Sequence, residues 1–322
     1  MSGEDDLIAR YFMPLASDPG AFGLIDDAAI LQGSSDDLVV TTDAIVEGVH
    51  FLPDDPPDTI ARKALRVNLS DLAAKGASPA GFVLTLALPK ADEVWLAPFA
   101  SALGEDAKHF GCPLLGGDTV STPGPLMISV TAFGRVPRGK MVRRTGARAG
   151  DVVVVTGTIG DATLGLALLT QGSTQGSPAT QQALISRYRV PQPRSDLAIA
   201  VREHASAAMD VSDGLAGDLA KLCKASGVSA EIKLEQVPIS VGARVALRIK
   251  ATTLGALISG GDDYEILCTV PESSLAALQA AARAAGIEAT AIGAIREGGD
   301  PPRFIAAGGR VVTLKRGSYS HF

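Results

Sequence analysis

The chain has 322 residues, of which 46% are hydrophobic and 20% charged, a composition typical of a folded protein of about two domains. Its net charge of −6 argues against a protein that holds nucleic acid by its phosphates. The acidic start lacks the apolar stretch of a signal peptide, and no apolar run is long enough to cross a membrane. The three cysteines have no metal-binding spacing, so we expect buried thiols in a cytoplasmic protein that binds neither nucleic acid nor membrane.

Strands and helices alternate in the predicted N-terminal half: strands at 38–43, 82–88 and 126–136, and helices at 58–75 and 95–110. Asp58 is suited to cap the first helix and Gly76 to end it. Residues 119–150 contain no Asp or Glu, but they contain six Arg and Lys residues and several Pro and Gly residues. Such a connector is typical of a domain boundary, so we predict an N-terminal domain of residues 1–138 and a C-terminal domain of residues 139–322.

The C-terminal half repeats the alternation: strands at 151–156, 207–211 and 264–270, helices at 161–170, 215–225 and 275–285, and a polar loop at 171–180. The turn at 157–160 has two open interpretations, an anion site at the start of a helix or a packing turn. The whole pattern predicts an α+β (mixed α/β) protein with mixed sheets.

Carboxylates gather beside glycines and near the ends of predicted strands, at 26–27, 41–43, 116–119, 210–214 and 260–263. Asp71 and Asn68 lie one turn apart on an otherwise apolar predicted helix. Converging carboxylates repel one another unless cations offset their charge, and oxygen ligands without His or Cys suit Mg²⁺. Each cluster, taken alone, also fits ordinary turn chemistry.

Known phosphate-binding motifs are missing from the sequence. Residues 134–141 nearly match a P-loop, but Met141 stands where a hydroxyl would bind Mg²⁺. No protein-kinase motif set is present either. Any phosphate site is therefore built differently.

Several motifs together carry a family resemblance: Glu47–Phe51 (EGVHF), Val67–Ala74 (VNLSDLAA), Gly116–Thr119 (GGDT), Asp210–Leu215 (DVSDGL) and Ser259–Gly261 (SGG). The chain resembles, end to end, the thiamine-monophosphate kinase family, which belongs to the superfamily of aminoimidazole ribonucleotide synthetase and selenophosphate synthetase. The resemblance implies phosphorylation of thiamine monophosphate to thiamine diphosphate in thiamine diphosphate biosynthesis, with ATP as co-substrate and several Mg²⁺ ions. For this reaction we expect direct in-line transfer of the γ-phosphoryl group. The resemblance also implies a homodimer. The N-terminal ATP- and metal-binding domains would pair into a β-barrel flanked by helices, and C-terminal α/β sandwich-like domains would complete the active site.

The resemblance also implies roles for individual residues. The metal positions are Asp27, Thr41, Thr42, Asp43, Asp71, Asp118, Asp210 and Asp213. The ATP contacts are Gly117, Asp118, Arg144 and Ser212, and the substrate contacts are His50, Asp262 and Tyr319. The residues expected to act in catalysis are Asp43, Asp71, Asp210 and Arg144. The chain departs from the family at Asp262, which stands where the family usually has Glu, so the charge is kept on a shorter side chain.

Two other functions fit parts of the pattern. One is another ATP-dependent synthetase of the same superfamily that acts on a phosphorylated small molecule, and the other is a non-catalytic nucleotide sensor. The EGVHF motif and the C-terminal Tyr319–Phe322 segment favour the kinase. The complete set of carboxylates argues against the sensor.

Overall fold

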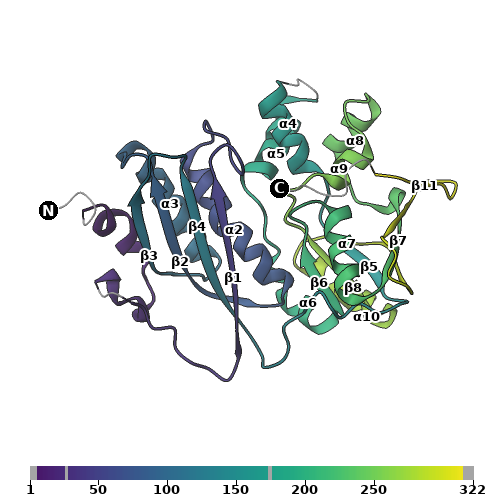
Figure 1. Cartoon of the computed structure of the whole chain (residues 1–322), viewed down its shortest axis with the longest axis horizontal. Helices are drawn as coiled ribbons and strands as arrows, with labels where there is room; N and C mark the ends of the chain where they lie inside the picture. The colour runs from purple at the N-terminus through teal and green to yellow at the C-terminus, as the bar shows by residue number, and fades with distance from the viewer. Residues whose placement is uncertain (1–5, 26–27, 173–175, 315–322) are drawn as a thin grey trace. The chain divides into compact units, whose positions relative to one another are not determined.

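The computed structural model describes residues 6–25, 28–172 and 176–314, and the chain divides into two compact units (Figure 1). Unit 1 comprises Met1–Leu72 and Ala77–Gly139, and unit 2 comprises Ala73–Gly76 and Lys140–Phe322. The longer segment of unit 2 begins at Lys140, whereas Ala73–Gly76 also belongs to this unit and lies within the predicted N-terminal domain. Two predicted site residues, Asp27 and Tyr319, lie outside the described residues.

The described strands of unit 1 form one four-stranded sheet in the order β1-β4-β2-β3. Their bounds are β1 Asp37–Val46, β2 Ser78–Leu88, β3 Leu114–Ser121 and β4 Met127–Val136. Strand β4 is antiparallel to both β1 and β2, while β2 and β3 are parallel. The sequence did not predict β3, because two glycines interrupt its hydrophobic pattern. Within the described residues this sheet is open, so a single chain does not form the expected closed barrel.

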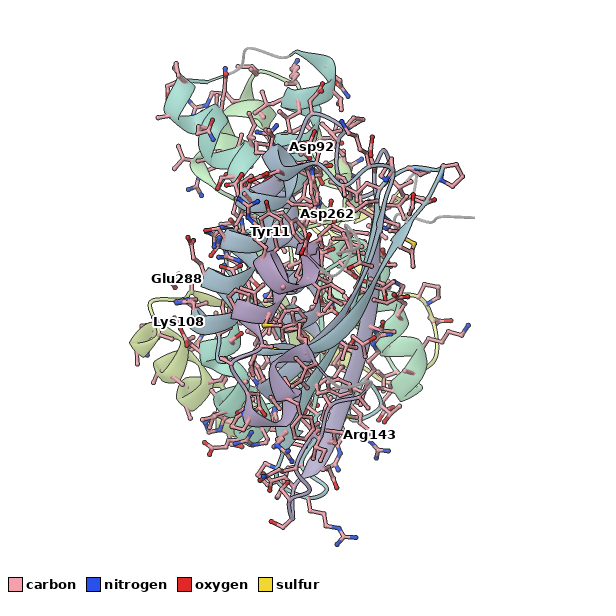
Figure 2. All side chains as sticks on the ribbon, turned by 90° about the vertical axis from the view of Figure 1, so that its left-hand side faces the viewer. Tyr11, Asp92, Lys108, Arg143, Asp262 and Glu288 are labelled. Carbon is pink, nitrogen blue, oxygen red and sulfur yellow. The ribbon has the colours of Figure 1, made fainter. Side chains whose placement is uncertain are left out.

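Helices α2 (Pro57–Ala74) and α3 (Glu93–His109) cover one face of this sheet (Figure 1). Their apolar sides pack on the strands in one core, which includes Leu65, Leu69, Phe99, Leu103, Leu84 and Ile128. The Asp92 carboxylate caps α3 by accepting the Val94 N–H at 2.9 Å, and Lys108 lies in its last turn (Figure 2). Asp58 lies inside the first turn of α2 rather than before it, so the prediction that it caps the helix is wrong. Short turns η1 (Ile8–Phe12), η2 (Met13–Leu15) and η3 (Pro19–Leu24) precede β1.

The described strands of unit 2 form a seven-stranded sheet in the order β11-β10-β7-β9-β5-β8-β6. The bounds are β5 Val152–Thr156, β6 Ala207–Asp210, β7 Ser229–Lys233, β8 Ile266–Val270, β9 Ala289–Arg296, β10 Arg303–Ile305 and β11 Val311–Val312. The helical segments are α4 Asp161–Gln171, α5 Pro178–Arg189, η4 Ser195–Leu197, α6 Ala198–His204, α7 Leu215–Ser226, η5 Leu234–Gln236, α8 Val241–Arg248, α9 Leu254–Ser259 and α10 Glu272–Ala284.

Helices pack on both faces of the unit 2 sheet. Val153 and Val155 of β5 share a core with α7, whereas Val154, which points the other way, shares a core with α6 and α10. Central strands buried on both sides explain why β5 and β8 are continuous apolar runs. The predicted loop at 171–180 is partly wrong, since α5 begins at Pro178.

The three cysteines are buried and form no disulfide. Burial raises the pKa of the Cys112 and Cys268 thiols to about 12 and that of Cys223 to about 11. They therefore stay protonated at neutral pH and act as small apolar side chains. None of the helices in the described part of the chain has the length and apolarity that a bilayer-spanning segment needs.

Candidate active-site residues

Thr41, Asp43 and Asp71 share the face of the unit 1 sheet that α2 covers. Thr41 and Asp43 alternate in the middle of β1, so their side chains point to the same side. The Thr41 hydroxyl donates a hydrogen bond of 2.5 Å to Asp71 Oδ2 on α2. The sequence placed residues 41–43 at the end of a strand, but β1 continues to Val46 because those polar residues pair in regular register with β4.

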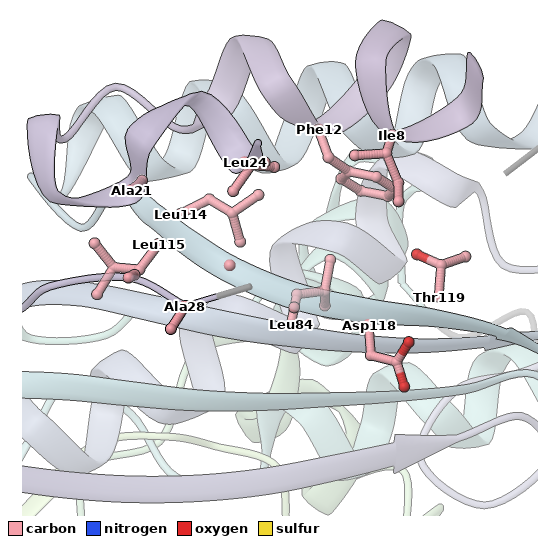
Figure 3. Close-up of a pocket in the computed structure, with 13 residues that line it drawn as sticks. Ile8, Phe12, Ala21, Leu24, Ala28, Leu84, Leu114, Leu115, Asp118 and Thr119 are labelled. Atoms are coloured by element: carbon pink, nitrogen blue, oxygen red, sulfur yellow. The ribbon is translucent and has the colours of Figure 1, made fainter. Parts of the chain in front are cut away.

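Thr42 and Asp118 lie on the opposite face of the same sheet. The Thr42 hydroxyl is 3.0 Å from the hydroxyl of Thr131, its partner in register on β4. Asp118 is in register with Thr85, one residue after Leu84, whose side chain belongs to the core under the helices. Figure 3 shows the Asp118 carboxylate pointing away from the side on which Leu84 and Phe12 lie. The structure thus places Thr41, Asp43 and Asp71 on one face of the sheet, with Thr41 bonded to Asp71, and places Thr42 and Asp118 on the other face.

Gly117, a predicted ATP contact, must be a glycine. A Cβ there would lie 2.0 Å from the Leu84 carbonyl oxygen, because β2 and β3 approach closely at this point. Beside it is a cavity of about 200 Å³ (Figure 3). Apolar side chains of the N-terminal turns and residues of β3 form its walls, and the lining includes Ile8, Phe12, Leu24, Leu114, Gly116, Gly117, Asp118 and Thr119.

In unit 2 the backbone holds four predicted site residues in one place. Asp210 ends β6 and is buried, and Ser212 and Asp213 follow it in a turn. The Asp262 N–H donates to the Ser212 carbonyl at 2.8 Å, which fixes the predicted substrate residue beside the predicted ATP contact. Asp262 and Tyr264 have φ angles of 70° and 50°. For a bulky residue such as tyrosine this conformation is strained, and such strain is concentrated at functional sites.

Asp218 and Lys221 support that turn, and sequence reasoning missed both. Asp218 Oδ2 accepts the backbone N–H groups of Ser212 and Asp213 at 3.1 and 2.9 Å. Lys221 donates to Asp218 Oδ1 at 2.8 Å and also pairs with Asp213. Burial raises the pKa of Asp218, and the Lys221 ammonium opposes that rise. The spacing of three residues between Asp218 and Lys221 on α7 was the available signal.

Asp263 accepts backbone N–H groups where the predicted turn 157–160 leads into α4, while the Gly157 and Ile159 N–H groups donate to the Glu288 and Pro238 carbonyls. Its Oδ2 accepts the Gly160 N–H at 2.8 Å, and its Oδ1 accepts the Ala162 N–H at 3.4 Å. Complete burial raises the pKa of Asp263 well above its usual range, and the Gly160 hydrogen bond lowers it in part. The packing interpretation of this turn is therefore confirmed, and a protein carboxylate takes the place that an external anion would need.

Glu265 is the centre of a second buried cluster that the sequence did not indicate. It is 0% exposed and accepts hydrogen bonds from Thr156 Oγ1 at 2.7 Å and from Arg187 Nη2 at 2.7 Å. Arg194 Nε donates to the same carboxylate at 2.6 Å. These residues come from β5, from α5 and from the segment after it, so the cluster joins parts of the chain that are distant in sequence.

Arg144, predicted to contact ATP, is exposed in unit 2, and its carbonyl accepts the Ser226 hydroxyl at 2.6 Å. Within the described ranges no group of three or more His, Cys, Asp or Glu side chains gathers closely enough to hold a metal ion. The oxygen donors that do lie together, Thr41 with Asp71, are of the kind that Mg²⁺ prefers.

Comparison with known proteins defines the class first. Residues 25–136 match the AIR synthase related protein, N-terminal domain, and residues 148–303 match the corresponding C-terminal domain. A thiamine-monophosphate kinase of Caulobacter vibrioides is 45% identical over 99% of this chain and 90% of its own length. The crystal structure of the Stenotrophomonas maltophilia thiamine-monophosphate kinase has a TM-score of 0.84 at 38% identity and covers 96% of each chain. AaThiL complexed with AMPPCP and TMP has a TM-score of 0.79 at 32% identity, covering 94% of this chain and 97% of that one. The chain belongs to the thiamine-monophosphate kinase family.

Proposed function

We propose that this chain transfers the γ-phosphoryl group of ATP to thiamine monophosphate and so makes thiamine diphosphate. The observation that carries the proposal is the end-to-end relationship to thiamine-monophosphate kinases at up to 45% identity. A further support is that AaThiL, a related structure, is complexed with AMPPCP and TMP.

The acceptor in this reaction is a phosphate that is already anionic, so it needs no strong general base. The main barrier is the repulsion between two phosphate groups, and catalysis then consists of positioning and charge neutralisation. We propose Asp43, Asp71 and Asp210 as catalytic groups on this ground, with Arg144 as a cation near the transferred charge. The polar pairing of Thr41 with Asp71 supports this, because it holds one carboxylate on a defined face of the sheet.

The carboxylates are also the proposed holders of Mg²⁺, since carboxylate and hydroxyl oxygens suit this ion and no His or Cys donor is needed. Bound Mg²⁺ would supply positive charge against the phosphates of both substrates. The proposed set is Asp27, Thr41, Thr42, Asp43, Asp71, Asp118, Asp210 and Asp213.

For the substrates we propose separate contacts. ATP would bind Gly117, Asp118, Arg144 and Ser212, and thiamine monophosphate would bind His50, Asp262 and Tyr319. The cavity beside Gly117 supports the first group, because two of the four proposed ATP contacts, Gly117 and Asp118, line it.

A homodimer is part of the proposal. The unit 1 sheet is open, and its helix-free face carries exposed apolar side chains at Leu38, Val40 and Val120. A second copy that covers this face and pairs with the edge strands β1 and β3 would close the two sheets into a barrel. Residues 1–138 would then bind ATP and metal and form the dimer, and residues 139–322 would complete the site. The buried free thiols support a cytoplasmic location.

The test is to incubate the purified chain with Mg-ATP and thiamine monophosphate and to measure thiamine diphosphate and ADP. We expect both products in equal amounts, and no thiamine diphosphate when Mg²⁺ is chelated. ADP without thiamine diphosphate would favour another synthetase of the superfamily. ATP binding without turnover by the folded protein would favour a sensor.

A further inference from the structure

The turn that follows β1 carries His50 in an unusually well-fixed position. The backbone N–H groups of Val49 and His50 donate to the Val46 carbonyl at 3.1 and 2.9 Å, and the Gly48 N–H donates to the Phe51 carbonyl at 2.8 Å. Gly48 has a φ of 79°, which glycine adopts without strain. The turn therefore closes on itself, and His50 lies at its end.

The ring of His50 also folds back onto the strand. Its Nδ1 accepts the backbone N–H of Val46 at 3.1 Å. Strand β1 is at the edge of its sheet, and the next residue, Glu47, donates its N–H to the carbonyl of Leu126, the residue before β4 begins. Because successive N–H groups of a strand point in opposite directions, the Val46 N–H points away from β4. The imidazole thus satisfies an N–H that the sheet does not use.

This contact fixes the position of the ring proton. A backbone amide nitrogen can only donate, so Nδ1 must present its lone pair, and the proton of the neutral ring lies on Nε2. We propose that the Val46 N–H holds His50 as its Nε2–H tautomer, and that Lys63 is a positioning residue which holds the same turn from α2. The substrate role of His50 rests on the proposed function, whereas its tautomer does not.

Lys63 contacts the backbone carbonyl of His50. Its side chain is among the largest that are fully buried, with the residue only 2% exposed, and Nζ donates to the His50 carbonyl at 2.7 Å. A buried ammonium is costly unless its hydrogen bonds are met, so this lysine is not an ordinary filler of the core. The ring of His50 is thus fixed by β1 and its carbonyl by α2.

The tautomer decides what His50 can recognise. Nε2–H is a donor, so it selects a substrate atom with a lone pair, such as a phosphate oxygen or an unprotonated ring nitrogen. It cannot accept a proton from the substrate through Nε2. His50 would therefore bind and orient thiamine monophosphate and would not serve as a general base, which agrees with an acceptor phosphate that needs none.

The tautomer is testable without any activity measurement. In the ¹⁵N-histidine-labelled chain at neutral pH, the His50 signals are identified by their loss in His50→Gln. We expect a pyridine-like Nδ1 and a pyrrole-like Nε2. The reverse pattern, or an even mixture of the two tautomers, would overturn the proposal. A chain with the expected pattern but no thiamine-monophosphate kinase activity would refute the proposed function and leave the tautomer standing.

Two amide variants of His50 distinguish the roles of Nδ1 and Nε2 in steady-state kinetics. His50→Gln places an amide NH₂ near the position of Nε2, whereas His50→Asn places an oxygen near Nδ1, where it can accept the Val46 N–H. We expect His50→Asn to raise KM for thiamine monophosphate about ten- to hundredfold, the range for losing a hydrogen bond to a charged group, and His50→Gln to raise it less. KM for ATP should stay the same in both. A smaller rise in His50→Asn than in His50→Gln would overturn the donor role.

Lys63→Met and Lys63→Arg test the positioning role. We expect Lys63→Met to raise KM for thiamine monophosphate more than KM for ATP and to weaken the Nε2–H preference in the ¹⁵N spectrum, while Lys63→Arg recovers part of both. If Lys63→Met does not fold, the same two readouts in Lys63→Gln decide, because its shorter, uncharged side chain weakens the contact, and an unshifted ¹⁵N pattern with an unchanged KM would overturn the role. Unchanged values in a folded Lys63→Met would also overturn it.

Discussion

At the scale of single residues, Asp43 is a carboxylate in the middle of strand β1. A β-branched or apolar side chain at this position would stabilise the strand more than aspartate does. Asp43 is exposed, so it contributes little to the core of unit 1. We expect Asp43→Asn to lower kcat by at least about 100-fold, since charge neutralisation is the main catalytic effect in phosphoryl transfer. The melting temperature should change little. Asp36→Asn, at an exposed loop position, is the matched control, and near-normal turnover by Asp43→Asn would remove Asp43 from the site.

We expect the buried carboxyl group of Asp263 to make the free energy of unfolding depend on pH. Its pKa is raised by burial, so the stability it contributes is fully present below the unfolded pKa and is lost as pH rises through the higher folded pKa. Asp263→Asn removes this titration. The free energy of unfolding of the wild type, minus that of Asp263→Asn, should therefore fall as pH rises above about 4 and then level off. Urea unfolding at a series of pH values measures it, and a difference that does not change with pH would contradict the assignment.

At the scale of elements, Glu265 joins β5, α5 and the segment that leads to η4. Its carboxylate is fully buried and pairs with two arginines, Arg187 and Arg194, that are themselves mostly buried. Removing one member of such a cluster leaves buried charge without compensation. We expect Glu265→Gln to lower the free energy of unfolding by about 3 kcal/mol, and the exposed Glu235→Gln in η5 to change it by less than about 0.5 kcal/mol. Denaturant unfolding measures both variants. If Glu265→Gln and Glu235→Gln lowered the free energy of unfolding by the same amount, the buried cluster would add no stability.

The elements also show where sequence reasoning works. Helix α2 and strand β4 were predicted closely, because their hydrophobic patterns are long and residues that favour turns, such as Gly76 and Pro137, follow them. Strand β3 was missed because its stability comes from its neighbour β2 and from the close approach at Gly117, not from its own side chains. The short strands β10 and β11 carry too few residues for a periodic pattern, and they form only because each pairs with another strand.

At the scale of the whole molecule, the open face of the unit 1 sheet predicts self-association. Val40 is 55% exposed on that face and lies opposite Phe133 in register. We expect light scattering to give about twice 32.9 kDa for the wild type and the monomer mass for Val40→Arg, because a buried arginine without a partner is costly at an interface. Val94→Arg, at an 83% exposed position on α3, should leave the dimer intact. A wild-type monomer would refute the proposed homodimer.

The sequence by itself determined the family and the two-domain mixed α/β class, because motifs and periodicity are local properties of the chain. It also singled out Asp43, Asp71 and Asp118 without showing how they are arranged. Only the tertiary structure decided that Asp43 and Asp71 share one face of the sheet while Asp118 lies on the other, because strand register fixes the direction of each side chain. The same holds for the Nδ1 contact of His50 with Val46 and for the buried partners of Glu265, which form where the fold brings their backbone and side-chain donors within hydrogen-bonding distance.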